Sequence, residues 1–147
     1  MCGIAGIINY ESLEAAVRLA AEFRQVMARR GPDGDGTWHD GRVIFTHRRL
    51  AVIDLAGAVQ PLFNEDRSVV AVVNGEIYNY RELRDELRAR GHRFATDGDC
   101  EVIVHGYEEF GAGVWARLDG MFAVALYDIK AGMLYLARDI FGKKPLV

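Results

Sequence analysis

The order of apolar segments limits the fold of this 147-residue chain more than any other feature of its sequence. Short β-branched runs with strand character lie toward both ends, and runs with helical spacing of apolar residues lie mainly between them. We expect strands at 2–8, 37–39, 43–53, 68–73, 121–128 and 133–139, and helices at 13–29, 80–90 and 102–110. This order predicts one α+β domain over residues 1–147, with mostly antiparallel sheets.

Capping and turn residues set the expected ends of several elements. Ser12 is placed to cap the first helix, and Asn79 followed by Glu82 has the spacing of a capping box. The Asp-Gly pair at 40–41 predicts a hairpin turn. Residues 54–64 are expected to form a long loop.

Composition and charge exclude several classes of protein. The formal net charge is −3, and no basic stripe favours nucleic acid as a partner. No apolar run approaches the roughly 20 residues of a membrane span, and we see no signal peptide. The two cysteines give no disulfide framework, so a reducing, cytoplasmic location is expected. The histidines are scattered without ligand spacing, so no metal site is expected: they are His39, His47, His92 and His105.

Cys2 can act as a nucleophile if Met1 is removed, which the small Cys2 side chain permits. Cys2 then carries a thiol and a free α-amine. Because an α-amine has a pKa of about 7.7–8.0, it is partly neutral near pH 7 and can accept the thiol proton. The alternative is that Cys2 is a small apolar residue that opens a buried strand at 2–8. The rest of the chain has to decide between the two interpretations.

Asn74 and Gly75 follow the apolar run 68–73 and can supply hydrogen-bond donors to an oxyanion. The donors would be the Asn74 side-chain amide and the Gly75 backbone N–H. The alternative for an Asn-Gly pair is a type I′ hairpin turn. The residues after Gly75 have loop and then helix character rather than strand character, which argues against the hairpin.

Three charged residues could hold a polar substrate. The planar guanidinium of Arg49 suits bidentate binding of a carboxylate, although a solvated strand residue is the simpler interpretation. Asp99 could bind an ammonium group or cap the helix that follows it. Glu76 could accept a hydrogen bond from an amide NH₂ or pair with a basic neighbour. Their joint occurrence and order along the chain carry more information than any one of them.

Eight short motifs in a fixed order extend from one end of the chain to the other. They are Cys2-Gly3-Ile4-Ala5-Gly6, Arg30-Gly31-Pro32-Asp33-Gly34, His47-Arg48-Arg49-Leu50, Gln60-Pro61-Leu62, Asn74-Gly75-Glu76-Ile77-Tyr78-Asn79, Asp99-Cys100-Glu101, Asp119-Gly120-Met121-Phe122-Ala123, and Arg138-Asp139 with Phe141-Gly142-Lys143-Lys144-Pro145-Leu146. With these motifs the chain resembles the N-terminal glutaminase domain of glutamine-hydrolysing asparagine synthetase. That domain is a class II glutamine amidotransferase with the N-terminal-nucleophile hydrolase fold.

The resemblance implies a four-layer αββα sandwich and a role for each site residue. It implies that Cys2 is the nucleophile with its α-amine as base, and that Asn74 and Gly75 form the oxyanion hole. It places the glutamine α-carboxylate on Arg49 and the α-amine on Asp99. The implied reaction converts glutamine and water to glutamate and ammonia through a glutamyl thioester. The remaining implied contacts to glutamine are Leu50, Ala51, Val52, Ile53 and Glu76.

The resemblance also implies partners beyond this segment. Ammonia would pass to a synthetase domain, in cis or in trans, that uses ATP and Mg²⁺ to activate aspartate; this segment is expected to need no cofactor. The chain stops at Val147, before the last elements expected of such a domain, so a C-terminally truncated domain is expected. A homodimer is a further possibility, and Cys100 is expected to be structural. The alternative function is a catalytically silent module that binds glutamine or docks on a partner.

Overall fold

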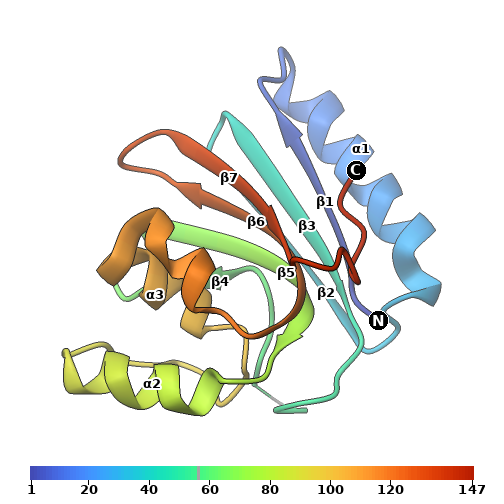
Figure 1. Ribbon diagram of the computed structural model, residues 1–147. Helices are drawn as coiled ribbons and strands as arrows, with labels where there is room; N and C mark the ends of the chain where they lie inside the picture. The colour runs from blue at the N-terminus through green and yellow to red at the C-terminus, as the bar shows by residue number, and fades with distance from the viewer. Residues whose placement is uncertain (56) are drawn as a thin grey trace.

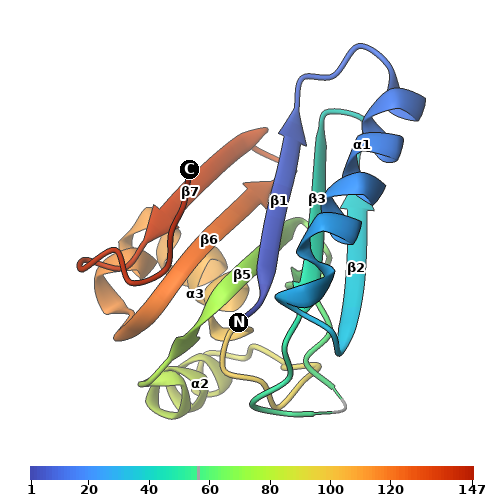
Figure 2. The ribbon, with the colours of Figure 1, turned by 90° about the vertical axis from the view of Figure 1, so that its right-hand side faces the viewer.

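The fold, seen in a computed structural model that describes residues 1–55 and 57–147, has four layers. Figures 1 and 2 show helix α1 (Leu13–Val26) on one side of two stacked sheets and helices α2 (Tyr80–Ala89) and α3 (Val102–Phe110) on the other. In spatial order, the first sheet contains β1 (Gly3–Ile8), β3 (Val43–Arg49) and β2 (Gly34–His39), and the second sheet contains β4 (Leu62–Phe63), β5 (Val69–Ile77), β6 (Gly120–Asp128) and β7 (Met133–Arg138). All strand pairs in these sheets are antiparallel, which confirms the expected α+β class and its layers.

Strand β5 is buried on both faces, which explains its nearly continuous apolar sequence. Val70 and Val72 belong to a core between the two sheets that also contains Phe45. Ala71 and Val73 belong to the larger core beneath α2 and α3. Because successive side chains point to opposite faces of a strand, one strand can stabilise two cores.

Helix α1 covers the outer face of the first sheet. The Ser12 hydroxyl accepts a hydrogen bond from the N–H of Ala15 at 3.3 Å, which confirms the predicted cap. Ala16 and Ala20 are buried against Ile44, and their small side chains let the helix approach the sheet closely. The last predicted helical residues, Met27–Arg29, form a 3₁₀ turn instead.

Several strand boundaries differ from the prediction. β3 ends at Arg49 rather than at residue 53. β5 continues past residue 73 because β6 pairs with it as far as Ile77, so the Asn-Gly pair at 74–75 lies inside a strand and forms no hairpin turn. The predicted loop 54–64 contains the two-residue strand β4. β1 is an edge strand in which only Gly3 is buried, so the prediction of a buried strand at 2–8 is wrong.

The side chain of Asn79 does not cap helix α2, although the residue occupies the N-cap position. Its amide nitrogen donates to the carbonyl of Arg117 at 2.9 Å, and its oxygen accepts from the N–H of Asp119 at 3.0 Å. The predicted capping box with Glu82 is therefore wrong. The Asn79 side chain instead binds the segment before β6.

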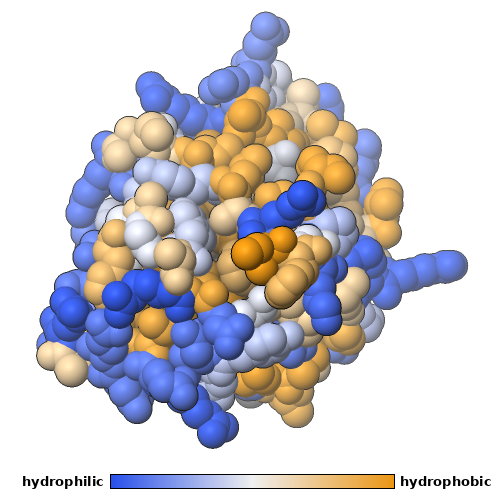
Figure 3. All heavy atoms as spheres, in the orientation of Figure 1, coloured by the Kyte–Doolittle hydropathy of each residue, from blue (hydrophilic) through white to orange (hydrophobic). Residues whose placement is uncertain are grey.

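An apolar groove lies between β1 and β7, which are edge strands of the two sheets. Ile8, Leu136 and Val147 line this groove and are each more than half exposed. In Figure 3 hydrophobic side chains gather at the centre of the face that the C-terminal segment crosses. Among the described residues, no helix combines the length and the hydropathy of a membrane span.

His47 on β3 carries a buried imidazole. It is 1% exposed, and neither ring nitrogen has a hydrogen-bond partner among the described residues. Burial, followed by the charge of Arg49, lowers the pKa of His47 from 6.5 to about 4. Between these two pH values the unfolded chain binds a proton that the folded chain excludes. Folding stability should therefore fall as the pH decreases from about 6.5 to about 4.

Because only the unfolded chain protonates His47 in this range, we expect the unfolding free energy to fall by about 2 kcal/mol when the pH is lowered from 7.5 to 5. Urea unfolding at the two pH values would measure the loss. His47→Gln should remove most of it, and His39→Gln, at an exposed position on β2, should leave it unchanged. The same pH-dependent loss in all three proteins would show that His47 does not carry it.

Candidate active site

One pocket opens at the end of the sandwich where β1 begins and where β3 and β5 end. Of the predicted site residues, the pocket is lined by Cys2, Arg49, Leu50, Val52, Ile53, Asn74, Gly75, Glu76 and Asp99. Ala51 does not line it, and its backbone N–H donates to Asp33 Oδ2 at 2.8 Å outside the pocket wall. The fold thus brings together residues that are up to 97 positions apart in the sequence. Their chemical roles stay predictions.

The Cys2 thiol lies against the backbone of Leu50. Its Sγ is 3.4 Å from the Leu50 amide nitrogen and 3.7 Å from the Leu50 carbonyl oxygen. The register of β1 against β3, which sets Gly3 opposite Arg48, brings the two residues together just beyond the strands. The backbone of Leu50 thus holds the thiol at the pocket.

The backbone N–H of Gly75 points away from β6. Its partner there, Phe122, uses its own backbone groups on the opposite side: its N–H donates to Asp139 Oδ2 at 3.1 Å and its carbonyl accepts from the Asp139 N–H at 2.8 Å. Residues that face each other in an antiparallel pair exchange either both hydrogen bonds or neither. Gly75 therefore directs its N–H and its carbonyl to the side that lines the pocket.

On this side of β5, side chains bind the backbone groups of the residues two positions before and two positions after Gly75. Val73 exchanges two hydrogen bonds with the buried Gln60 side chain, at 2.6 and 3.1 Å. The N–H of Ile77 donates to Asp99 Oδ2 at 2.8 Å. Strand β4 pairs only with residues 70 and 71. Within the part of the chain that the structure describes, no side chain or loop accepts from the Gly75 N–H, so this donor is available to a group bound in the pocket.

Asn74 directs its side chain toward the first sheet. It shares this face of β5 with Val70 and Val72, which contact the first sheet through the core between the sheets. Asn74 is buried and lines the pocket together with Cys2. A side-chain amide and a backbone N–H on adjacent residues thus border the cavity that the thiol faces.

Arg49 is buried at the end of β3 and holds the loop that follows it. Its guanidinium donates to the carbonyls of Leu55 at 3.0 Å, of Ile53 at 3.4 Å and of Asp54. The prediction that Arg49 is merely a solvated strand residue is excluded by this burial. A guanidinium has five N–H donors, so three bonds to the loop leave capacity for a carboxylate.

Asp99 is held at the pocket wall by its bond to the Ile77 N–H rather than acting as a helix cap. The segment before it is fixed by Glu101, whose carboxylate accepts from the N–H groups of Ala95 at 2.7 Å and Thr96 at 2.8 Å. Because a carboxylate has about four acceptor positions, Asp99 can still receive an ammonium group. Arg49 and Asp99 therefore bring opposite charges to one cavity.

The structure adds pocket residues to which the sequence assigned no role. Gln60 positions Val73, as described above, and Lys144 is a buried ammonium whose Nζ lies 3.0 Å from Met1 Sδ. Asp139 holds the segment that carries Lys144, because its carboxylate accepts from the N–H of Lys143 at 2.9 Å and of Lys144 at 3.2 Å. Both Gln60 and Lys144 lie within sequence motifs noted above, but their local sequence gives no sign that they reach the pocket.

Cys100 is the second cysteine at this pocket, and its surroundings differ from those of Cys2. Its side chain is buried, and its Sγ donates to the Gly75 carbonyl at 3.7 Å. Burial, followed by the negative charge of Asp99, raises the pKa of the Cys100 thiol well above its ordinary value. The neutral thiol is a poor nucleophile, so Cys100 fits the structural role expected for it.

Comparison with known proteins places the chain in a family. The profile of the family described as "Glutamine amidotransferase domain" matches residues 1–147, and the chain belongs to this family. It is 46% identical to asparagine synthetase [glutamine-hydrolyzing] 2 of Bacillus subtilis, over 99% of this chain and 20% of that protein. It is 44% identical to asparagine synthetase [glutamine-hydrolyzing] 1 of Arabidopsis thaliana, over 97% of this chain and 24% of that protein. The chain thus spans about a fifth to a quarter of the length of these relatives.

A solved structure shares the fold. The glutamine phosphoribosylpyrophosphate amidotransferase of B. subtilis superposes with a TM-score of 0.69 over 92% of this chain and 37% of that chain. The two sequences are 17% identical over this region, so the likeness concerns the fold alone. It agrees with the N-terminal-nucleophile hydrolase arrangement that the resemblance implied.

We expect Gly75 to tolerate no side chain, because a Cβ there would lie 2.3 Å from the Met121 carbonyl oxygen and 2.6 Å from Phe122 Cα. Gly75→Ala should push β5 away from β6, lowering the unfolding free energy by about 1–3 kcal/mol. Gly113→Ala is the matched control, since a Cβ at Gly113 would meet no atom within 4 Å. Chemical denaturation of both variants would test this, and equal stability of the two would contradict the close approach of the strands.

Proposed function

We propose that this chain is the glutaminase part of an asparagine synthetase and that it hydrolyses glutamine to glutamate and ammonia. Membership of the glutamine amidotransferase family supports glutamine as the substrate. The observation that carries the proposal is the single pocket in which the Cys2 thiol, the Gly75 N–H and the opposite charges of Arg49 and Asp99 meet. The thiol would supply the nucleophile and the Gly75 N–H a donor to the oxyanion. Arg49 and Asp99 would bind the carboxylate and the ammonium of an α-amino acid.

Cys2 acts as the nucleophile after Met1 has been removed. The freed α-amine accepts the proton of Sγ, and the sulfur attacks the side-chain amide carbon of glutamine. The tetrahedral intermediate collapses when the α-ammonium returns the proton to the amide nitrogen, which leaves as ammonia. Water then attacks the glutamyl thioester, releasing glutamate and restoring the thiol. A retained Met1 would place the Cys2 nitrogen in a peptide bond and so remove the base.

The negative oxygen of each tetrahedral intermediate is stabilised by Gly75 and Asn74. The Gly75 N–H is supported in this role by its orientation away from β6 and by the absence, among described residues, of another side-chain or loop acceptor for it. The Asn74 amide lies on the face of β5 that is directed toward the first sheet. Strand pairing fixes the Gly75 N–H and the backbone of Asn74 before substrate arrives, so little backbone reorganisation is needed when charge develops.

The α-carboxylate of glutamine binds Arg49 and its α-amine binds Asp99. Arg49 retains donors beyond those that hold the loop, and Asp99 retains acceptor positions beyond the one taken by Ile77. Substrate binding can also draw on the backbone of the segment after Arg49, which lines the same pocket. Glu76 accepts a hydrogen bond from the substrate amide. The lining residues of that segment are Leu50, Val52 and Ile53.

Ammonia made here is used by a synthetase domain outside this segment. The relatives named above are glutamine-hydrolysing asparagine synthetases, several times longer than this chain. We therefore infer an acceptor reaction on aspartate that depends on ATP and Mg²⁺, with the synthetase domain acting in cis or in trans. A reducing, cytoplasmic setting suits this chemistry because it keeps the Cys2 thiol reduced.

Mass spectrometry after incubation with 6-diazo-5-oxo-norleucine, an electrophilic glutamine analogue, tests the nucleophile. We expect one covalent adduct on the N-terminal Cys2 peptide, with Met1 absent, and none on the peptide that contains Cys100. Cys2→Ala should lose both the adduct and the release of ammonia from glutamine. Turnover that survives Cys2→Ala, or normal turnover with Met1 in place, would refute the mechanism. A processed protein that binds glutamine without an adduct or turnover would favour the catalytically silent module.

Steady-state kinetics of Asn74→Ala tests the oxyanion donor. Because the interaction forms only when the oxygen becomes negative, kcat should fall by about 10²–10³-fold while KM changes little. Alkylation of Cys2 by iodoacetamide should continue at the wild-type rate, because that reaction uses the thiol without the oxyanion donor. A raised KM with an unchanged kcat would assign Asn74 to substrate binding instead.

A further inference from the structure

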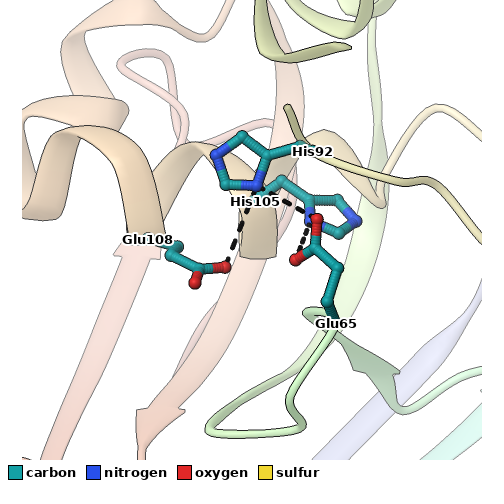
Figure 4. A group of neighbouring side chains, drawn as sticks. All are labelled: Glu65, His92, His105 and Glu108. Carbon is teal, nitrogen blue, oxygen red and sulfur yellow. Dashed lines mark hydrogen bonds and ion pairs between the residues drawn. The ribbon is translucent and has the colours of Figure 1, made fainter. Parts of the chain in front are cut away.

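A cluster of four potential metal ligands lies on α3 and the two segments that pack against it (Figure 4). None of the four lines the pocket of Cys2. Glu65 comes from the β4–β5 loop, His92 from the segment after α2, and His105 and Glu108 from adjacent turns of α3. One ligand atom from each residue lies within 4.8 Å of the others. The spacing of the histidines in the sequence gave no sign of a metal site, but the fold brings two of them together.

The separations between the facing atoms suit a small divalent cation. His105 Nδ1 lies 3.1 Å from Glu65 Oε2, and His92 Nδ1 lies 3.2 Å from Glu65 Oε1 and 3.9 Å from Glu108 Oε2. Zinc binds imidazole nitrogen and carboxylate oxygen at about 2.0–2.2 Å, which places adjacent tetrahedral ligands roughly 3.3–3.5 Å apart. Two imidazole nitrogens with two carboxylates form a donor set that suits zinc and related transition metals.

The outer ring nitrogens are held as they are in known zinc sites. His105 Nε2 lies 3.2 Å from Glu101 Oε1, and His92 Nε2 lies 3.4 Å from Glu109 Oε2. A neutral imidazole has one N–H and one lone pair. If each Nε2–H points to its outer carboxylate, both Nδ1 lone pairs face the inner carboxylates. Such an arrangement of oxygen and nitrogen lone pairs is repulsive unless a metal ion lies between them or a second proton occupies Nδ1.

Charge balance supports the same conclusion. Four carboxylates surround the two imidazole rings: those of Glu65, Glu101, Glu108 and Glu109. Among the described residues, Arg90 offsets part of this negative charge through its ion pair with Glu109 at 2.7 Å. Even with a second proton on each imidazole, three positive charges would face four negative ones. Lys130 also acts on Glu108 through its charge, but its direct partner is Asp66, at 2.6 Å.

The inner carboxylates are oriented, and the cluster remains accessible. Asn64 Nδ2 donates to Glu108 Oε2 at 2.9 Å, and the Arg93 N–H donates to Glu65 Oε1 at 2.7 Å. The His105 side chain is 1% exposed, whereas those of Glu65 and Glu108 are 33% and 38% exposed. One side of the cluster is thus rigid and dry, and the other admits an ion from solvent.

We propose that Glu65, His92, His105 and Glu108 bind one divalent transition-metal ion of the zinc class. The ion cross-links the β4–β5 loop, the α2–α3 connection and α3. It is a structural site, since all four positions are filled by protein ligands. The proposal does not depend on the glutaminase activity, and its test uses metal binding rather than turnover.

The experiment titrates untagged, chelator-treated protein with Zn²⁺ and with Co²⁺, followed by calorimetry and by cobalt absorption. The Cys2→Ala background removes the partly exposed Cys2 thiol as a competing ligand. We expect one ion per chain and a tetrahedral cobalt spectrum. Glu108→Gln and His92→Gln should each weaken binding at least tenfold. His39→Gln, on β2 and outside the cluster, should leave the affinity unchanged.

Histidine ¹H–¹⁵N spectra of the unsubstituted cluster provide a readout that does not depend on the folding of a variant. Added Zn²⁺ should shift Nδ1 of His92 and His105 while Nε2 keeps its proton. No binding by the parent protein would overturn the proposal and assign the cluster to proton-mediated ion pairs. Binding of one ion that neither Glu108→Gln nor His92→Gln weakens would overturn it as well, because the ion would then lie elsewhere.

Discussion

The candidate active site depends on the way an antiparallel strand distributes its backbone hydrogen bonds. Toward any one neighbour, a strand directs the N–H and carbonyl groups of every second residue. On the side of β5 away from β6 these residues are Val73, Gly75 and Ile77, and Gln60 and Asp99 satisfy the first and the last. β4 begins only at Leu62, opposite Ala71, so within the described part of the chain no strand pairs with Gly75 on this side. The late start of β4 therefore leaves the Gly75 N–H available to a group bound in the pocket.

One carboxylate on the other side of β6 maintains this arrangement. Asp139 binds both backbone groups of Phe122 and thereby fixes the orientation of the Gly75–Phe122 pair. The same carboxylate accepts from the N–H groups of Lys143 and Lys144, which turns the chain back toward the pocket and buries the Lys144 ammonium beside Met1. Asp139 thus sets both the orientation of the proposed oxyanion donor, Gly75, and the position of the Lys144 ammonium.

Periodicity in the sequence predicted the helices well where one face is apolar, as in α1 and α2. It failed where tertiary contacts decide the outcome. β5 continues through Asn74 and Glu76 because β6 pairs with it, although these polar residues end the apolar run. Arg49 and Asp99 were found through motifs in a fixed order rather than through periodicity. Gln60 and Lys144 reach the pocket only through pairing with distant segments, for which a single sequence contains no local signal.

Glu101 connects the histidine cluster to the pocket. Its carboxylate lies 3.2 Å from His105 Nε2 and also accepts from the N–H groups of Ala95 and Thr96, while Asp99, two residues before it, lines the pocket. Cys2, in contrast, is held by the pairing of β1 with β3 in the other sheet. Loosening the cluster should therefore disturb the group proposed to bind the substrate amine before it disturbs the nucleophile. Cys2 and Asp99 are thus held by separate layers of the sandwich, and of these two residues Asp99 is the one coupled to α3.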